Sequence, residues 1–150
     1  MTMSKLHFIT AFMSLIVASS CFGQDSITKE FDAWPLTCSE LGSTKTVYCT
    51  FQNREYQHIV DIEGIGFRSK TDVKEFCDDL NEALVYVTNK NKDEATWTTP
   101  NVDARITAPF VGKSMYIATE DGYFTITAKP KHVAHVVDGL NAAANHVWGN

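Results

Sequence analysis

Apolar positions recur with the period of a helix in two segments of the chain and alternate in the segments between them. Residues 70–87 and 129–148 each carry a stripe of apolar side chains at helical spacing. Alternating runs predict strands at residues 34–38, 47–51, 56–65, 104–110, 114–119 and 123–127. An amphipathic sheet and two striped helices bury each other's apolar surfaces, so we predict an α+β fold, an antiparallel β-sheet with two helices on one face.

The two helical segments resemble each other when the numbering is shifted by 60 positions. The expected core positions of the first helix fall on apolar residues of the second, and DDLNEA at 78–83 falls on DGLNAA at 138–143. The pattern indicates a tandem β-β-β-α pseudo-repeat, with units at about residues 33–88 and 103–148. Chance agreement between two amphipathic helices is the alternative.

Residues 1–23 have the layout of a secretory signal peptide. Lys5 is their only charged residue, an apolar run follows at 8–18, and small residues precede the expected cleavage after Gly23. The apolar run is shorter than the about 20 residues that span a bilayer. We therefore predict export to the periplasm or the medium, as a single α+β domain of residues 24–150.

Two alternatives remain for this segment. The apolar run has the composition of a buried N-terminal helix as well, although such helices seldom lack flanking charges. A lipoprotein cut would leave Cys21 as a lipid-anchored N-terminus, but Ala18 is a poor match for the large aliphatic residue that such a cut needs. We favour removal of Cys21 with the signal peptide.

Three cysteines follow residue 23, and an exported chain can oxidise a pair of them. A hairpin with its turn at residues 42–45 places Cys38 opposite Cys49, within disulfide range. We predict a Cys38–Cys49 disulfide bond. Cys77 then lies on the apolar side of the first helix as a small buried hydrophobe, and a Cys49–Cys77 bridge is the alternative.

The charge balance bears on possible partners. The full chain has a formal net charge of −5. Without Lys5 the basic residues number 12 against 18 acidic ones, which gives −6 for residues 24–150. Phosphate backbones repel an acidic surface, so we expect no nucleic acid. No second apolar run reaches spanning length, and an uncovered sheet edge leaves homo-oligomer formation open.

The run EGIGFRSKTD resembles a phosphate-binding loop, with Gly64 followed by Ser69 and Lys70. Such a loop needs glycine where Ser69 stands, because the backbone wraps closely around the phosphate there. We interpret Ser69 as the N-cap of the first helix, accepting a hydrogen bond from the Asp72 amide. Gly64 and Gly66 are interpreted as a strand bulge. No nucleotide or other cofactor is predicted.

Histidines are the remaining candidates for metal or acid–base chemistry. His132, His135 and His146 fall near one stripe of the second helix, but His146 lies about 16 Å further along the axis than His135. A metal site needs three or four ligands, and His58 or Asp138 would have to complete it. A solvated helix face is the simpler interpretation, so we predict no metal.

Cys77 is a poor catalytic thiol, because the acidic residues beside it would raise its pKa. The motifs of serine hydrolases, zinc proteases and dithiol oxidoreductases are absent from the sequence. Catalysis is therefore uncertain, and we lean against it.

The sequence favours an exported protein that binds or inhibits a macromolecular partner outside the cytoplasm, as an inhibitor, immunity-type protein or adaptor. Candidate contact residues are Tyr48, Thr50 and Thr125 on the polar side of strands. Trp97 joins them as a large aromatic in a polar connection, where folding back onto the sheet is at least as good an interpretation. A small hydrolase using a histidine and an acid, and a structural subunit of an envelope assembly, are the alternatives.

Overall fold

The structure is a computed structural model that describes residues 26–31, 34–41, 45–52, 62–109, 112–120 and 122–149. The signal-peptide prediction and Cys21 lie outside these residues. The first half consists of β1 (Ser26–Phe31), β2 (Trp34–Leu41), β3 (Thr46–Gln52), β4 (Ile62–Phe67) and helix α1 (Lys70–Thr88). The second half consists of β5 (Ala95–Thr98), β6 (Arg105–Ala108), β7 (Ser114–Ala118), β8 (Tyr123–Thr127) and helix α2 (Pro130–Trp148).

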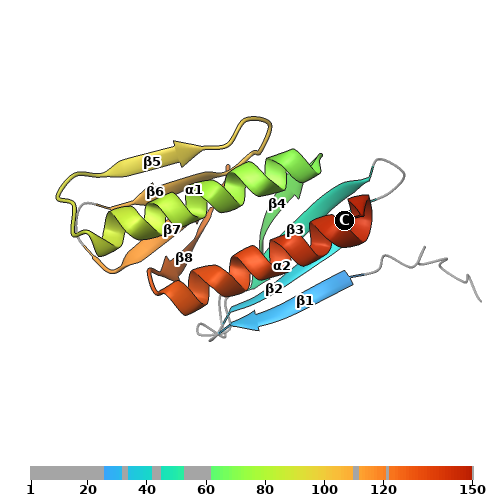
Figure 1. Cartoon of the computed structure of the whole chain (residues 1–150), viewed down its shortest axis with the longest axis horizontal. Helices are drawn as coiled ribbons and strands as arrows, with labels where there is room; N and C mark the ends of the chain where they lie inside the picture. The colour runs from blue at the N-terminus through green and yellow to red at the C-terminus, as the bar shows by residue number, and fades with distance from the viewer. Residues whose placement is uncertain are drawn as a thin grey trace, which may run out of the picture.

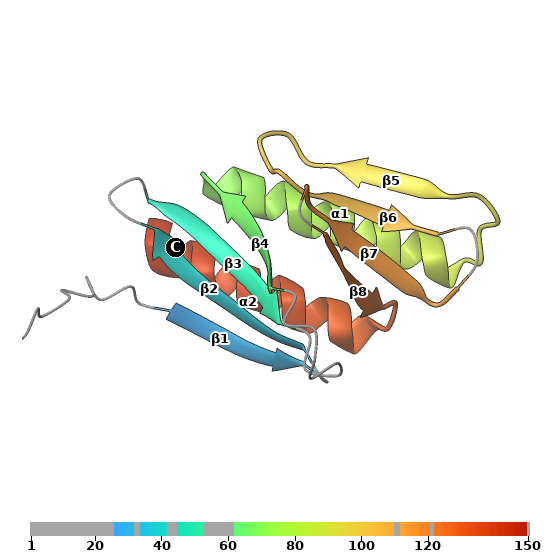
Figure 2. The same cartoon turned by 180° about the vertical axis from the view of Figure 1, so that it is seen from behind.

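The strands form two antiparallel sheets, each with four strands paired in chain order (Figure 1). The α+β class is confirmed, but the single sheet expected from the sequence is divided into a first sheet, β1 to β4, and a second sheet, β5 to β8. Within each half the strands pair in chain order, and β4 and β8 are edge strands of their sheets. Both helices lie on one side of the sheets, whose other side faces the viewer in Figure 2.

Each helix packs mainly on the sheet of the other half. Helix α1 contacts β5, β6 and β7, whereas α2 contacts β1, β2 and β3. The helices also contact each other and run in opposite directions, since the Lys70 ammonium at the start of α1 donates to the Gly149 carbonyl, just beyond the end of α2, at 2.8 Å. This exchange of helices joins the two sheets through one continuous core.

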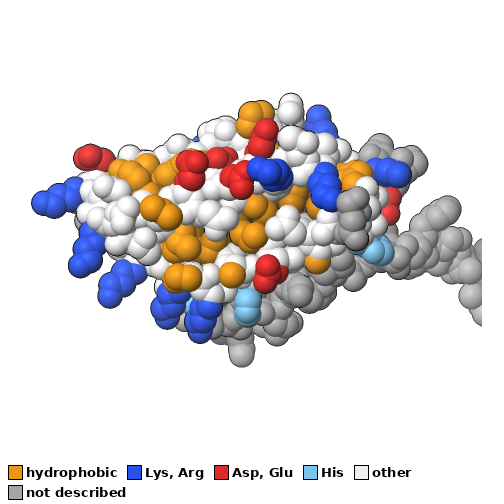
Figure 3. All heavy atoms as spheres, viewed as in Figure 1, with side chains coloured by type: hydrophobic (Ala, Val, Ile, Leu, Met, Phe, Trp, Pro, Cys, Tyr) orange, Lys and Arg blue, Asp and Glu red, His pale blue; other side chains and the backbone are white. Residues whose placement is uncertain are grey.

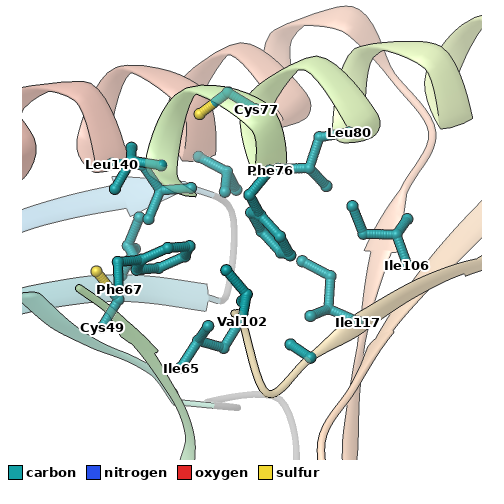
Figure 4. Packing of buried hydrophobic residues seen from close by; sticks show 14 of the residues in the cluster. Cys49, Ile65, Phe67, Phe76, Cys77, Leu80, Val102, Ile106, Ile117 and Leu140 are labelled. Carbon is teal, nitrogen blue, oxygen red and sulfur yellow. The ribbon is translucent and has the colours of Figure 1, made fainter. Parts of the chain in front are cut away.

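The core lies between the sheets and the helices, and Figure 4 shows its centre. Phe76 points from α1 toward Ile106 and Ile117 of the second sheet, while its ring meets that of Phe67 edge to face, with centroids 5.4 Å apart. All four side chains are fully buried. Residues from both halves therefore meet at α1.

The helices correspond closely in position, with 19 residues each and all bounds 60 positions apart. Val73 and Val133 are both buried, as are Leu80 and Leu140. Each half has four strands before its helix, where the sequence predicted three. Strands β1 and β5 both precede the predicted units, and the duplication itself stays a prediction.

The predicted hairpin is present in the expected register, with Leu41 opposite Thr46 and Cys38 opposite Cys49. Cys38 and Cys49 form a disulfide bond across the pair, with Cα atoms 4.0 Å apart. The prediction of this bond is confirmed. The β7–β8 hairpin is present too, and the Thr119 amide donates to the Gly122 carbonyl at 2.8 Å near its turn.

The bulge predicted at Gly64 and Gly66 is wrong. Strand β4 pairs with β3 residue for residue from Ile62 to Phe67. The glycines have another cause, since a Cβ built on Gly64 would overlap the phenol ring of Tyr48. The predicted strand 56–65 is described only from Ile62 onward.

Candidate partner-binding face of the sheets

The side of both sheets away from the helices, here called the outer face, carries mostly hydroxyl groups and tyrosine rings. Along each strand, buried residues toward the helices alternate with residues that point outward. None of the following outward residues is buried: Thr37, Ser39, Tyr48 and Thr50 of the first sheet, and Thr96, Thr107, Ser114, Tyr116, Tyr123, Thr125 and Thr127 of the second.

Tyr48 and Gly64 form a pair on the first sheet. Tyr48 lies on β3 opposite Gly66, and its ring extends over Gly64 on β4. Glycine at position 64 leaves room for the ring to lie flat along the strand, an arrangement that also covers a residue with no side chain of its own. Tyr48 remains 37% exposed. It is held in place and is still available for contact.

A second aromatic pair lies on β7 and β8. Tyr116 and Tyr123 meet edge to face with ring centroids 5.6 Å apart, and Tyr123 is 63% exposed. Across the sheet, Tyr116 is flanked by Thr107 and Thr125. Thr125 is predicted on this face from the sequence, but Tyr116 and Tyr123 are not. Their alternation with Met115, Ile117 and Phe124 was the available signal.

The outer face is almost free of charge. Among the outward-pointing strand residues whose side chains are described, Arg105 is the one that carries a charge, and by register Glu30 of β1 also falls on this side. The hydroxyl groups pair across strands, as in the 3.4 Å contact between the Thr96 and Thr107 Oγ1 atoms. The Thr50 hydroxyl donates to the Thr37 carbonyl at 3.4 Å. A surface of this kind offers hydrogen bonds and aromatic contact with little electrostatic steering.

The predicted contact residues divide between two places. Tyr48, Thr50 and Thr125 all lie on the outer face. Trp97 lies on β5 but packs against the core, where its Nε1 donates to the Glu82 carboxylate of α1 at 3.2 Å and its ring meets that of Tyr86 edge to face. Its position matches the alternative considered for it, a tryptophan folded back on the sheet.

The segment that resembles a phosphate loop has a structural role. Ser69 caps α1 by accepting from the Asp72 amide at 3.1 Å, as predicted. The Asp72 carboxylate in turn accepts from the Arg68 amide at 3.1 Å. Gly64 lies within a paired strand, and Lys70 reaches the carbonyl beyond α2, where a cation is favourable. The groups that would bind a phosphate therefore already have partners within the fold.

Cys77 is a free, buried cysteine in the middle of α1. Burial raises the pKa of its thiol from the ordinary value of 9.0 to about 12, and the nearby Asp78 carboxylate contributes to the increase. The thiolate is the reactive form, and it is scarce at neutral pH under these conditions. This environment suits the predicted packing role.

The raised pKa of Cys77 predicts a pH-dependent stability. The folded state holds the thiol proton more tightly than the unfolded state, so the stabilisation is complete below about pH 9 and is lost as the pH rises toward 12. Between pH 8 and pH 10, the free energy of unfolding should fall by about 1.4 kcal/mol more in the wild type than in Cys77→Ala. Urea titrations of both proteins measure this difference. The other titrating groups contribute equally to the pH dependence of both proteins, so their contributions cancel. Equal pH slopes would contradict it.

The histidines are not placed as the sequence suggested. His135 and His146 are exposed on α2, but His132 is buried, contrary to the solvated stripe expected for all three. The difference arises because the first turn of α2 packs onto the molecule next to β8. Within the described residues, no group of three metal-binding side chains comes together.

A lysine-lined pocket, not predicted from the sequence, lies at the end of the molecule where α1 ends and α2 begins. Its signals were the short basic runs NKNK at 89–92 and KPK at 129–131. Of the helices that are described, neither has the length and apolar character required to cross a membrane. Comparison of the chain with protein-family models, curated proteins and solved structures found no match.

Proposed function

We propose that the protein is an exported binding module that uses its outer face to hold a protein partner outside the cytoplasm. The observation that carries this proposal is the composition of that face, where tyrosines and hydroxyl residues stand exposed on strands whose opposite side is packed under two helices. Tyrosine and serine-type side chains are favoured in adaptable protein-binding surfaces, because they combine contact area with hydrogen bonding.

The chemistry of the face also suggests the nature of the partner. A nearly uncharged surface gives no advantage to nucleic acid or to a strongly charged protein. A partner with a neutral, hydrogen-bonding surface is a better match. The disulfide bond between Cys38 and Cys49 is compatible with a location where thiols are oxidised.

Site-specific crosslinking tests the proposal. Benzoylphenylalanine at Tyr123 or Tyr48 replaces one exposed aromatic ring by another, and irradiation of cells that naturally express the protein should give one adduct with a different protein. Val85 on α1 is 56% exposed and serves as the matched position on the opposite side. We expect no such adduct from it.

Charge placed on the outer face should then remove the adduct. Thr50→Glu combined with Thr125→Glu is expected to reduce crosslinking at Tyr123 at least tenfold, because a partner would have to desolvate the new carboxylates. Stability should change by about 0.5 kcal/mol or less, as for most surface substitutions. Asn81→Glu combined with Asn141→Glu, at exposed positions of α1 and α2, is the charge-matched control. The proposal would be overturned if Val85 alone gave an adduct, or if the only adduct joined two copies of this chain. It would also be overturned if no position gave an adduct.

A further inference from the structure

A pocket of about 500 Å³ opens where three separate segments meet. They are the end of α1 with the residues that follow it, the β6–β7 connection, and the junction between β8 and α2. The volume lies in the range of sites for small organic molecules. Of the outer-face residues, Thr127 lines the pocket but none of the tyrosines does, so the pocket meets the proposed partner surface only at this residue.

Four lysines line the pocket: Lys90, Lys92, Lys113 and Lys129. None of the described lining residues is acidic. None of them forms an ion pair with another described residue, whereas Lys74 pairs with Asp78 on α1. Asp93 and Glu94 follow in the chain, but neither lines the pocket. Four lysines without an ion pair around one pocket make the local potential positive.

This cluster stands out because the chain as a whole is acidic, with a net charge of −5. Figure 3 shows Lys and Arg side chains gathered at the end where α1 finishes and α2 starts, while Asp and Glu side chains lie along α1. Like charges repel, so a group of lysines without counter-charges is stabilised by an anion. Lys129 on the pocket wall is the N-cap residue of α2, so the positive end of the helix dipole lies beside the pocket.

The remaining wall of the pocket is apolar. Val87, Pro109 and Ala128 line it together with the ring of Tyr86. Tyr86 is fixed from two sides, because its hydroxyl donates to the Asp93 carbonyl at 3.2 Å and its ring contacts that of Trp97. A small inorganic anion would leave this apolar wall in contact with water. A ligand with an apolar body would cover it.

Hydrogen bonds fix the segments that form the pocket. The Ala128 amide donates to the Lys113 carbonyl at 2.7 Å, which ties the β6–β7 connection to the start of α2. The Asn91 side chain donates to the Tyr86 carbonyl at 3.0 Å and holds the segment after α1. Lys90 has a left-handed backbone, with φ of 55°, at a helix end where glycine is favoured.

We propose that this pocket binds an amphipathic organic anion, in which a carboxylate or phosphate head meets the lysines and an apolar body lies against Val87, Pro109 and Ala128. The head group belongs either to a free acid or to an anionic lipid, since both present the same chemistry. Lys113 precedes β7 and Lys129 follows β8, and the Ala128 hydrogen bond ties these two neighbouring segments together. Replacement of these two lysines should weaken binding of the anion most.

A matched pair of fluorescent probes tests the charge requirement. Anilinonaphthalene sulfonate is an amphipathic anion, and N-phenylnaphthylamine is nearly the same body without the sulfonate. We expect the anionic probe to bind at one site and the neutral probe to bind at least tenfold more weakly. Lys113→Gln with Lys129→Gln should weaken the anionic probe at least tenfold and leave the neutral probe unchanged. Lys113→Arg with Lys129→Arg should keep most of the affinity, because the charge remains.

The control is Lys45→Gln with Lys74→Gln, which removes the same total charge from exposed sites away from the pocket. Circular dichroism of each variant checks that the fold is retained. Displacement of the probe by monomeric decanoate would assign a free acid as the ligand source. Displacement only by phosphatidylglycerol vesicles, and not by phosphatidylcholine vesicles, would assign a lipid. Equal binding of both probes, equal affinity in the Gln variants, or displacement by none of these ligands would overturn the proposal.

Discussion

Replacement of Phe76 by alanine is expected to lower the free energy of unfolding by about 4 kcal/mol. Phe76 is fully buried on α1, and its ring packs edge to face against Phe67 of the first sheet. In Figure 4 it also points toward Ile106 and Ile117 of the second sheet. The substitution therefore removes the side chain that links α1 to both sheets, and it leaves a cavity where the two halves meet.

Urea titration at 25 °C measures this loss, with Val85→Ala as the control on the same helix. Val85 is 56% exposed, so its truncation should change stability by about 0.5 kcal/mol or less. Phe76→Leu retains most of the volume and should lose about 1.5 kcal/mol, which keeps the comparison measurable if Phe76→Ala does not fold. A loss below about 1 kcal/mol for Phe76→Ala would contradict the central position of this ring.

The helices could be predicted well because their information is local. A continuous apolar stripe of five turns specifies both the helix and its buried face, as Leu80 and Leu140 illustrate. Ser69 and Asp72 also mark the start of α1 within four residues. The hairpin register follows from loop length in the same way, since a four-residue loop between Leu41 and Thr46 fixes every pair behind it.

Strand β5, which was not predicted from the sequence, shows where local information is too weak. It lies in the polar run TNKNKDEATWTTPN, and Trp97 is its one large apolar residue. An edge strand of four residues with threonines on its exposed side has little hydrophobic alternation. Its place is determined by pairing with β6 and by contact with α1, and both lie outside the four residues of the strand itself.

The exchange of helices between sheets could not be predicted for a similar reason. Either helix presents an apolar stripe that fits either sheet, so periodicity does not decide which sheet it covers. The lysine pocket depends on the same long-range arrangement. Lys90, Lys113 and Lys129 come from three segments that meet only in the folded protein. The outer face, by contrast, followed from strand alternation alone, which placed Tyr48, Thr50 and Thr125 together on it.

Removal of the Cys38–Cys49 disulfide bond should cost about 3 kcal/mol of stability. The bond closes a loop with a sequence separation of 11 residues, which restricts the unfolded chain. Both cysteines are buried on the helix-facing side of the first sheet. Replacing these cysteines by a smaller residue therefore also removes packing beneath α2. This loss lowers the stability of the folded protein, as does the gain in entropy of the unfolded chain.

The double substitution Cys38→Ala with Cys49→Ala should melt about 10 °C below the wild type, as measured by circular dichroism. Reduction by dithiothreitol should lower the wild-type midpoint by a similar amount and leave the double variant unchanged, since only the wild type has a bond to break. Cys77→Ala is the control, because it removes the free thiol and should retain its sensitivity to reductant. A wild-type midpoint that does not respond to reductant, or a linked Cys49–Cys77 peptide after non-reducing digestion, would contradict the pairing. The outcome depends on the hairpin, because only the register that places Leu41 opposite Thr46 also brings Cys38 opposite Cys49.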